Sequence, residues 1–353
     1  MSGPVSLARA DLRAFVPYES AVPRADLVRL HANESQWRHD WDTTERGLNR
    51  YPEPRSEALA VQLAQLYGVP VDQVLLTRGS DDAIDVLVRA FCEAGRDRVV
   101  ICPPTFGMYA VAARLQGAEI VEVPLVAERD FALDLDETAV AGSEAKIVFL
   151  CSPNNPTGNT IPAEHVSELC RRLADRALVV VDEAYAEFAA DPSSAALRSE
   201  HDNLVILRTL SKAYALAGAR IGVLIGDPSL VRLLRGVLPP YPLPSLSLEA
   251  AERLLEPAAL ARAQAEVATT VERRDRLAAE LSGIDHVLKV WPSQGNFLLV
   301  RFRDAARALS ACLASGVLIR DFSRSPILEG CARITVGDEE QNRVVVDTLR
   351  RLE

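Results

Sequence analysis

The sequence lacks an excess of positive charge and lacks long apolar runs. Its 353 residues carry a formal net charge of −10, which argues against a basic surface that binds nucleic-acid phosphates. No stretch approaches the roughly 20 consecutive apolar residues that a membrane-spanning helix needs. We therefore expect neither a nucleic acid nor a membrane among the partners of this chain.

Paired cysteines and a signal peptide are also missing. The chain has six cysteines, but none forms a C-x-x-C pair, and several lie inside apolar runs. That pattern is typical of buried, reduced thiols in a cytosolic protein. Residues 1–20 mix charged side chains with short apolar pieces and contain no signal-peptide core. We expect a cytoplasmic protein without a metal site.

The composition is that of an ordinary globular protein, with 48% apolar and 25% charged residues and no repeat or low-complexity tract. The chain is too long for one small core, so we expect two domains. We assign residues 1–30 to a proline-interrupted arm, 31–260 to a large α/β domain and 261–353 to a smaller α+β domain.

Strands alternate with helical segments through the large domain, which predicts a mainly parallel sheet with helices on both faces. Short apolar runs bounded by turn residues mark the strands. The predicted strands are 74–77, 98–102, 146–151, 178–181, 204–207 and 220–226.

One aromatic and four polar side chains follow the ends of several of these strands: Phe106, Asn155, Asp182, Tyr185 and Lys212. Each has an ordinary structural explanation as a core residue, a turn residue, a helix cap or a solvated lysine. In a parallel sheet, however, they gather at one edge, where open α/β folds bind ligands. A pyridine ring that carries an aldehyde needs such a set: a carboxylate for its nitrogen, donors for its phenolic oxygen, an aromatic ring and a lysine.

A phosphate site is the further requirement of such a cofactor. Gly79, Ser80 and Asp81 precede a predicted helix, and the free N–H groups of a helix N-terminus attract anions. The alternative is simple capping of the helix by Ser80 or Asp81.

Four sets of residues resemble the fold type I aminotransferases that use pyridoxal 5'-phosphate. They are N-N-P-T-G at 154–158, D-E-A-Y at 182–185, T-L-S-K at 209–212 followed by A-G-A-R at 217–220, and A-R-I-T-V-G at 332–337. Further segments resemble the histidinol-phosphate aminotransferases within this group. These are N-R-Y-P-E-P at 49–54, P-P-T-F-G-M-Y at 103–109, P-Y-P-L at 240–243 and V-L-I-R-D at 317–321.

The resemblance implies a role for each residue of the cofactor site. Lys212 bonds the cofactor aldehyde and then moves the substrate Cα proton. Asp182 pairs with the ring nitrogen, Asn155 and Tyr185 hold the phenolic oxygen, and Phe106 stacks on the ring. The residues implied around the phosphate are Gly79, Ser80, Asp81, Thr209, Ser211 and Arg220, with Tyr51 from a second subunit.

The substrate residues are also implied by the resemblance rather than by their own pattern. Arg333 holds the anionic end of the substrate with Arg320 beside it, Asn155 contributes from the sheet edge, and Tyr18 closes over the site from the arm. The arm is expected to accompany the small domain. A homodimer with shared active sites follows from the same resemblance.

The implied reaction converts L-histidinol phosphate and 2-oxoglutarate to imidazole-acetol phosphate and L-glutamate, a step of histidine biosynthesis. The partners are thus a small amino donor and a 2-oxo acid. An aromatic or broad-specificity aminotransferase is the nearest alternative, because sister enzymes share most of these segments. A lyase similar to the threonine-phosphate decarboxylases would keep every cofactor residue. The family usually has tyrosine where this chain has Phe106.

Overall fold

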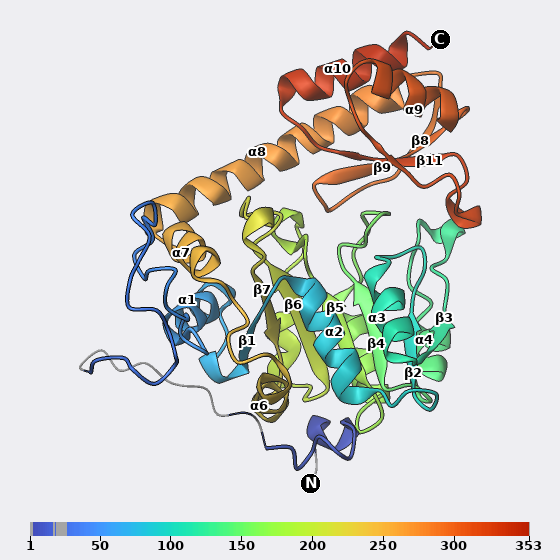
Figure 1. Cartoon of the computed structure of the whole chain (residues 1–353). Helices are drawn as coiled ribbons and strands as arrows, with labels where there is room; N and C mark the ends of the chain where they lie inside the picture. Colours follow the sequence, from blue (N-terminus) through green and yellow to red (C-terminus); the bar gives the residue numbers. More distant parts are fainter. Residues whose placement is uncertain (1–2, 17, 19–26, 353) are drawn as a thin grey trace.

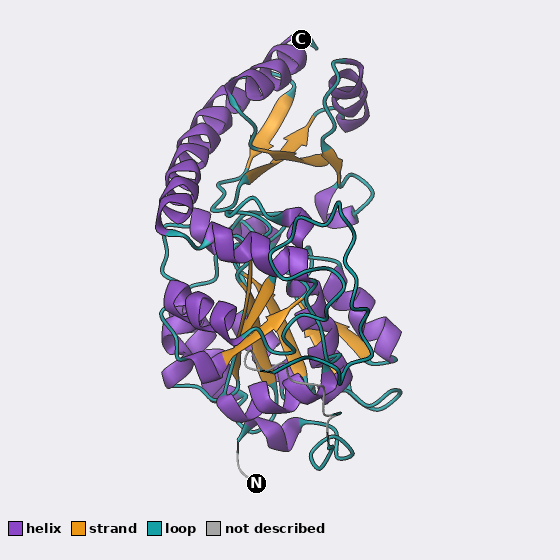
Figure 2. Cartoon of the chain, turned by 60° about the vertical axis from the view of Figure 1, so that its left-hand side comes forward, coloured by secondary structure: helices purple, strands orange, loops and turns teal. Residues whose placement is uncertain are grey.

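A large domain and a smaller one lie one above the other in the computed structural model (Figure 1), which describes residues 3–16, 18 and 27–352. The large domain is built on a seven-stranded sheet in the order β1-β7-β6-β5-β4-β2-β3. Helices cover both faces of this sheet (Figure 2). Within the described ranges, none of the helices has the length and apolar character to span a bilayer.

The large sheet is mainly parallel, as predicted. Its strands are β1 (Val74–Thr77), β2 (Arg98–Ile101), β3 (Glu119–Glu122), β4 (Ile147–Cys151), β5 (Leu178–Asp182), β6 (Leu204–Thr209) and β7 (Gly222–Ile225). Only β7 runs antiparallel to its neighbours, β1 and β6. The sequence analysis did not identify β3, a short edge strand whose two ends are exposed glutamates.

Alternate residues of the central strands enter two separate cores, which is why these strands read as continuous apolar runs. On β5, Leu178 and Val180 join one cluster, while Val179 and Val181 join the other. The first cluster includes α2 (Ser80–Phe91), α3 (Met108–Gln116) and α6 (Pro228–Val237). The second includes α1 (Glu57–Tyr67), α4 (Leu135–Gly142), α5 (Ala163–Arg172) and α7 (Ser245–Leu254).

The small domain contains a four-stranded antiparallel sheet in the order β10-β11-β9-β8. Its elements are β8 (Val287–Val290), β9 (Phe297–Phe302), α9 (Ala305–Ala314), β10 (Arg320–Asp321), β11 (Cys331–Thr335) and α10 (Glu339–Arg350). In the segment 317–321, only the two residues of β10 form a strand. This α+β unit agrees with the sequence analysis.

One long helix, α8 (Pro257–Ser282), joins the two domains (Figure 1). Its first half packs on the large domain through Leu260 and Val267, and its second half packs on the small domain through Leu277 and Leu281. The helix begins at Pro257, a residue suited to a first helical turn. The predicted boundary near 260 therefore falls inside an element that both domains share.

The described part of the arm lies against the large domain, which corrects the expectation that it accompanies the small one. Leu7 and Ala8 are buried in the core cluster of α2 and α6. The Arg9 N–H donates a hydrogen bond to the carbonyl oxygen of Ala90 at 3.0 Å. Burial of apolar side chains and this backbone pairing hold the first turn of the chain to α2.

Candidate active site

The carboxyl ends of the parallel strands surround a cavity of about 140 Å³. Most of the predicted cofactor residues line it, which confirms that they gather at one place. The lining residues are Ser80, Asp81, Phe106, Cys151, Asn155, Asp182, Ala184, Tyr185, Thr209, Ser211, Lys212, Ala217 and Arg220.

Asp182, the last residue of β5, is a buried carboxylate with neutral hydrogen-bond donors only. Its Oδ2 accepts from the Tyr109 hydroxyl at 2.9 Å, and its Oδ1 accepts from the Ala184 N–H at 3.2 Å. No described residue forms an ion pair with it. Burial raises the pKa of this carboxyl from 3.8 to about 6, because removal of water disfavours the charged form.

Lys212 follows β6 by three residues and points across the cavity. Its Nζ lies 5.7 Å from the centre of the Tyr185 ring. Burial, with the nearby positive charge of Arg333 as the next cause, lowers the pKa of this amine. A lowered pKa increases the fraction of neutral amine, which is the form that attacks a carbonyl carbon.

Asn155 connects the two domains through its side-chain amide. Its Nδ2 donates to the Tyr185 hydroxyl at 3.3 Å. Its Oδ1 accepts from Nη1 of Arg333 at 2.5 Å. Phe297 of the small domain meets the Tyr185 ring edge-on at 5.0 Å and lies 5.3 Å from the Arg333 guanidinium. The small domain therefore closes one side of the site with an arginine and an aromatic ring.

The N-terminus of α2 forms the far end of the cavity and is free of side-chain caps. Capping by Ser80 or Asp81 is therefore wrong, and the first N–H groups of this helix remain available to an anion. Gly222 of β7 lies directly against this turn, since a Cβ there would come within 2.3 Å of the Gly79 carbonyl carbon. The fold leaves no room for a side chain at that contact.

Hydroxyl and guanidinium groups flank this helix end. The Thr209 Oγ1 accepts from the Ser211 N–H at 3.1 Å and lies 2.9 Å from the Ser211 hydroxyl. Arg220 lies over Gly79, and its Nη2 donates to Asp81 at 3.2 Å. N–H, hydroxyl and guanidinium donors are the groups that bind phosphate oxygens.

Two contributors to the site were missed by the sequence analysis. One is Tyr109 on α3, whose hydroxyl reaches Asp182. The other is the buried pairing of Arg208 on β6 with Glu183 at 2.9 Å and Glu187 at 2.7 Å. A charged residue inside an apolar strand signals such a pair, because an unpaired buried charge is costly. This pairing fixes the ends of β5 and β6 relative to each other.

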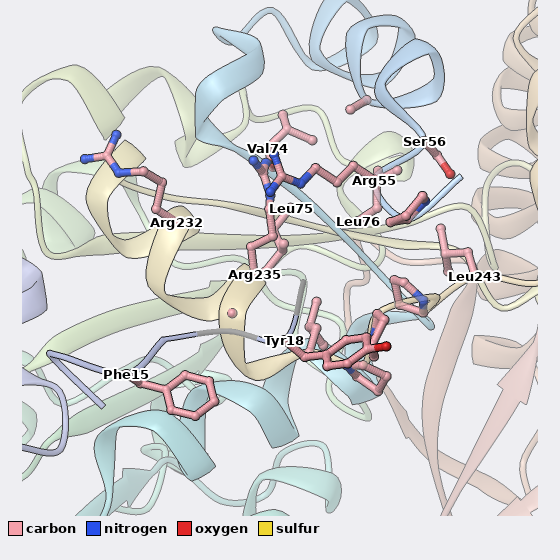
Figure 3. Close-up of a pocket in the computed structure, with 17 residues that line it drawn as sticks. Phe15, Tyr18, Arg55, Ser56, Val74, Leu75, Leu76, Arg232, Arg235 and Leu243 are labelled. Carbon is pink, nitrogen blue, oxygen red and sulfur yellow. The ribbon is translucent and has the colours of Figure 1, made fainter. Parts of the chain in front are cut away.

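Tyr18, expected to close over the substrate, lies away from Arg333 within the single chain. It lines a different cavity, of about 460 Å³, with residues that include Phe15, Arg55, Arg235 and Leu243 (Figure 3). The contacts of Leu7 and Ala8 with α2 and α6 hold the start of the arm to the large domain, away from β11. A contact of Tyr18 with a substrate therefore stays a prediction for an assembled protein.

Two further predicted residues lie near the site without lining it. Arg320 is exposed and pairs with Arg333 in the register of β10 with β11, so both guanidinium groups belong to one face of the small domain. Tyr51 is half-exposed, and its ring stacks on Tyr241 at 4.6 Å. Tyr51 is not among the residues that line the cavity of its own chain.

The residues present fit pyridoxal phosphate. Each reactive part of the molecule has a partner in the cavity. The buried carboxylate suits the ring nitrogen, the uncapped helix N-terminus suits the phosphate, and the amine of lowered pKa suits the aldehyde. The Nε of Arg333 is also buried without a hydrogen-bond partner in the described part of the chain. It leaves a donor available for an anionic substrate.

Comparison with known proteins agrees with this chemistry. The model of the class I and II aminotransferases matches residues 28–349. The chain belongs to the class I and II aminotransferases. Histidinol-phosphate aminotransferase of Stenotrophomonas maltophilia is 49% identical over 98% of this aminotransferase and 96% of its own length. The Xylella fastidiosa protein of that name is 47% identical over 99% and 97%.

Solved structures show the same fold for this aminotransferase. Histidinol-phosphate aminotransferase from Sinorhizobium meliloti, in complex with pyridoxal-5'-phosphate, superposes with a TM-score of 0.76 at 26% identity, covering 86% of this chain and 83% of that one. L-threonine-O-3-phosphate decarboxylase from Porphyromonas gingivalis superposes with a TM-score of 0.71 at 25% identity, covering 86% and 91%.

The raised pKa of Asp182 predicts a pH dependence of the cofactor-free protein. A carboxyl whose pKa rises from 3.8 to about 6 on folding stabilises the fold below pH 4, and this contribution is lost as the pH rises to 6. The loss is about 2–3 kcal/mol, since one pKa unit corresponds to roughly 1.4 kcal/mol. Asp182→Asn should flatten this part of the profile in chemical denaturation. An equally steep loss in Asp182→Asn would assign the effect to another group.

Proposed function

We propose that this aminotransferase transfers the amino group of L-histidinol phosphate to 2-oxoglutarate, giving imidazole-acetol phosphate and L-glutamate. The observation that carries the proposal is the identity of 47–49% over nearly the whole chain with proteins named for that activity. The gathering of Lys212, Asp182 and Arg333 at one site supports it.

Pyridoxal phosphate, when bound, supplies an aldehyde that reacts with amines and a ring that accepts electrons. Lys212 would hold the aldehyde end and, once released, would take the proton from the substrate Cα as a neutral base. Asp182, ionised, would keep a proton on the ring nitrogen. Asn155 and Tyr185 would hold the phenolic oxygen, and the α2 N-terminus, Thr209, Ser211 and Arg220 would hold the phosphate.

Substrate recognition falls to the two arginines of the small domain. A guanidinium fork matches both carboxylate and phosphate oxygens, whereas an ammonium group gives only a point charge. Arg333, held by Asn155 beside Lys212, is suited to the anionic group of both substrates in turn. Arg320, on the adjacent strand, is suited to the additional charge of a phosphate monoester.

A phosphate-substrate lyase is the alternative with a specific observation in its favour. The threonine-phosphate decarboxylase noted above shares the fold, and its cofactor chemistry would need the same residues. Its identity of 25% is about half the 49% of the Stenotrophomonas maltophilia protein and equals, within 1%, the 26% of the Sinorhizobium meliloti histidinol-phosphate aminotransferase. An aromatic amino acid aminotransferase remains the alternative within the transaminases, because Phe106 removes the hydroxyl that the family usually has there.

A donor screen separates these functions. The purified protein, loaded with pyridoxal phosphate, is given 2-oxoglutarate with histidinol phosphate, phenylalanine or threonine phosphate. We expect glutamate to form fastest with histidinol phosphate. Faster glutamate formation with phenylalanine would make the chain an aromatic aminotransferase. Release of CO2 from threonine phosphate without glutamate would make it a decarboxylase.

Covalent attachment of the cofactor at Lys212 is the first prediction for this site. Borohydride reduction should fix pyridoxal phosphate to the wild-type chain at the peptide that contains Lys212, as measured by mass spectrometry. Lys212→Ala should abolish this attachment and reduce turnover by orders of magnitude. A variant that still traps the cofactor at the wild-type rate would show that another amine is used.

The division of work between the two arginines gives the second prediction. One charge-assisted hydrogen bond is worth roughly 1.5–3 kcal/mol. Arg320→Ala should therefore lower kcat/KM for histidinol phosphate about ten- to a hundredfold and affect glutamate less. Arg333→Ala should reduce kcat/KM for both. A uniform effect of Arg320→Ala on both substrates would contradict the assignment.

We also propose that the protein acts in the cytoplasm as a homodimer with shared active sites. All six cysteines are buried and free, which supports a reducing compartment. The half-exposed Tyr51, stacked on Tyr241, does not reach its own cavity and is available to the phosphate of a second copy.

Mixed dimers test the shared site. Tyr51→Phe and Lys212→Ala chains should each have low activity, because each lacks one residue of every site. Mixed together after dissociation, they should regain part of the activity, since one site of each mixed dimer would then be intact. Full activity of a monomer in sedimentation experiments would contradict the shared site.

A further inference from the structure

A second layer of contacts lies behind the cofactor residues, and its central member is Tyr109. This tyrosine is fully buried on α3, and its hydroxyl donates to the Asp182 Oδ2 at 2.9 Å. Its ring is parallel to that of Phe149 on β4, at 4.8 Å with 3° between the planes. Stacking and burial hold the hydroxyl in one position, so the hydrogen bond is formed before any ligand arrives.

The same segment also positions Phe106. The Phe106 ring lines the cavity and meets the Tyr109 ring edge-on at 5.7 Å. Phe106 lies two residues before α3, and Tyr109 lies in its first turn. One short segment therefore carries both the aromatic ring that lines the cavity and the donor for the carboxylate behind it.

We propose that Tyr109 is a positioning residue that keeps Asp182 ionised and oriented for the ring nitrogen. The role given to Asp182 rests on the proposed function, whereas its hydrogen bond with Tyr109 is present in the structure. Tyr109 does not touch the cavity and acts only through Asp182. The Tyr109 hydroxyl holds Oδ2 and the Ala184 N–H holds Oδ1, so the carboxylate is fixed in orientation while each oxygen keeps a second lone pair.

Two hydrogen bonds lower the pKa of Asp182, and the bond from Tyr109 has a larger effect than the bond from the Ala184 N–H. A hydroxyl that donates to a carboxylate favours its charged form, and the hydrogen bond from Tyr109 lowers the pKa of Asp182 against the larger effect of burial. Burial raises the pKa of Tyr109 itself well above its ordinary value, so the hydroxyl remains a donor at physiological pH. The titratable groups that face Asp182 from the surrounding elements are Asp81, Tyr109, Cys151, Glu183, Tyr185 and Lys212.

Titration of Asp182 in the cofactor-free protein tests the contact directly. The carboxyl carbons are labelled with 13C in aspartate, and Asp182→Asn identifies the resonance. We expect Tyr109→Phe to raise the pKa of Asp182 by about one unit, a factor of ten in its ionisation. Site-specific 3-fluorotyrosine at 109, a stronger donor of nearly the same shape, should lower it. An unchanged pKa in both proteins would overturn the proposal.

Tyr67→Phe provides the matched control. Tyr67 is a tyrosine of the same domain whose hydroxyl oxygen is buried without a hydrogen-bond partner in the described part of the chain. Removal of the Tyr67 hydroxyl should leave the pKa of Asp182 unchanged. A shift as large as that of Tyr109→Phe would show that any loss of a tyrosine hydroxyl perturbs the domain, which would also overturn the proposal.

Cofactor affinity shows whether Tyr109 acts through Asp182. Equilibrium dialysis should give about tenfold weaker binding of pyridoxal phosphate to Tyr109→Phe than to the wild type, and no further loss when the change is made in Asp182→Asn. An equal loss in both backgrounds would mean that Tyr109 acts by packing alone and would overturn the proposal. A wild type that does not bind pyridoxal phosphate would refute the proposed function, while the titration would still decide the Tyr109 contact.

Discussion

The rest of the site depends on the burial of one carboxylate that the chain does not neutralise. Asp182 and Glu183 are adjacent and both buried, yet only Glu183 is paired with an arginine, Arg208. A buried charge without a partner is costly, and Asp182 receives only a hydroxyl and a backbone N–H. In the proposed function the positive charge comes from the cofactor, whose protonated ring nitrogen pairs with Asp182.

A second constraint is that the two domains meet at the reacting groups. Asn155 of the large domain holds Arg333 of the small domain, and Phe297 places a ring against both Tyr185 and Arg333. Because α8 is shared by both cores, the small sheet is carried on the same rigid helix that packs on the large domain. In the proposed function the small domain recognises the charge of the substrate, and the large domain holds the cofactor.

The sequence predicted that most of these residues gather around one cavity, because the carboxyl ends of parallel strands meet at one edge. Lys212, Asp182 and Asn155 follow apolar strands, and their meeting needs only the sheet. Tyr109 could not be found in this way, since its place in an amphipathic helix makes it indistinguishable from a core residue. The pairing of Arg208 was signalled by a charge inside a strand, but its partners depend on tertiary contacts. The position of residues 3–16 of the arm could not be predicted, because it depends on the tertiary contacts of Leu7 and Ala8 with α2 and α6.

The central claim is that Asp182 maintains a protonated ring nitrogen, and the 15N chemical shift of the bound cofactor tests it most directly. Pyridoxal phosphate labelled with 15N in the ring is bound to the wild-type protein, and its shift is recorded near neutral pH. The structure predicts the shift of a pyridinium, with a proton on the ring nitrogen, and the shift of an unprotonated pyridine in Asp182→Ala. An unprotonated pyridine shift in the wild type would contradict the account.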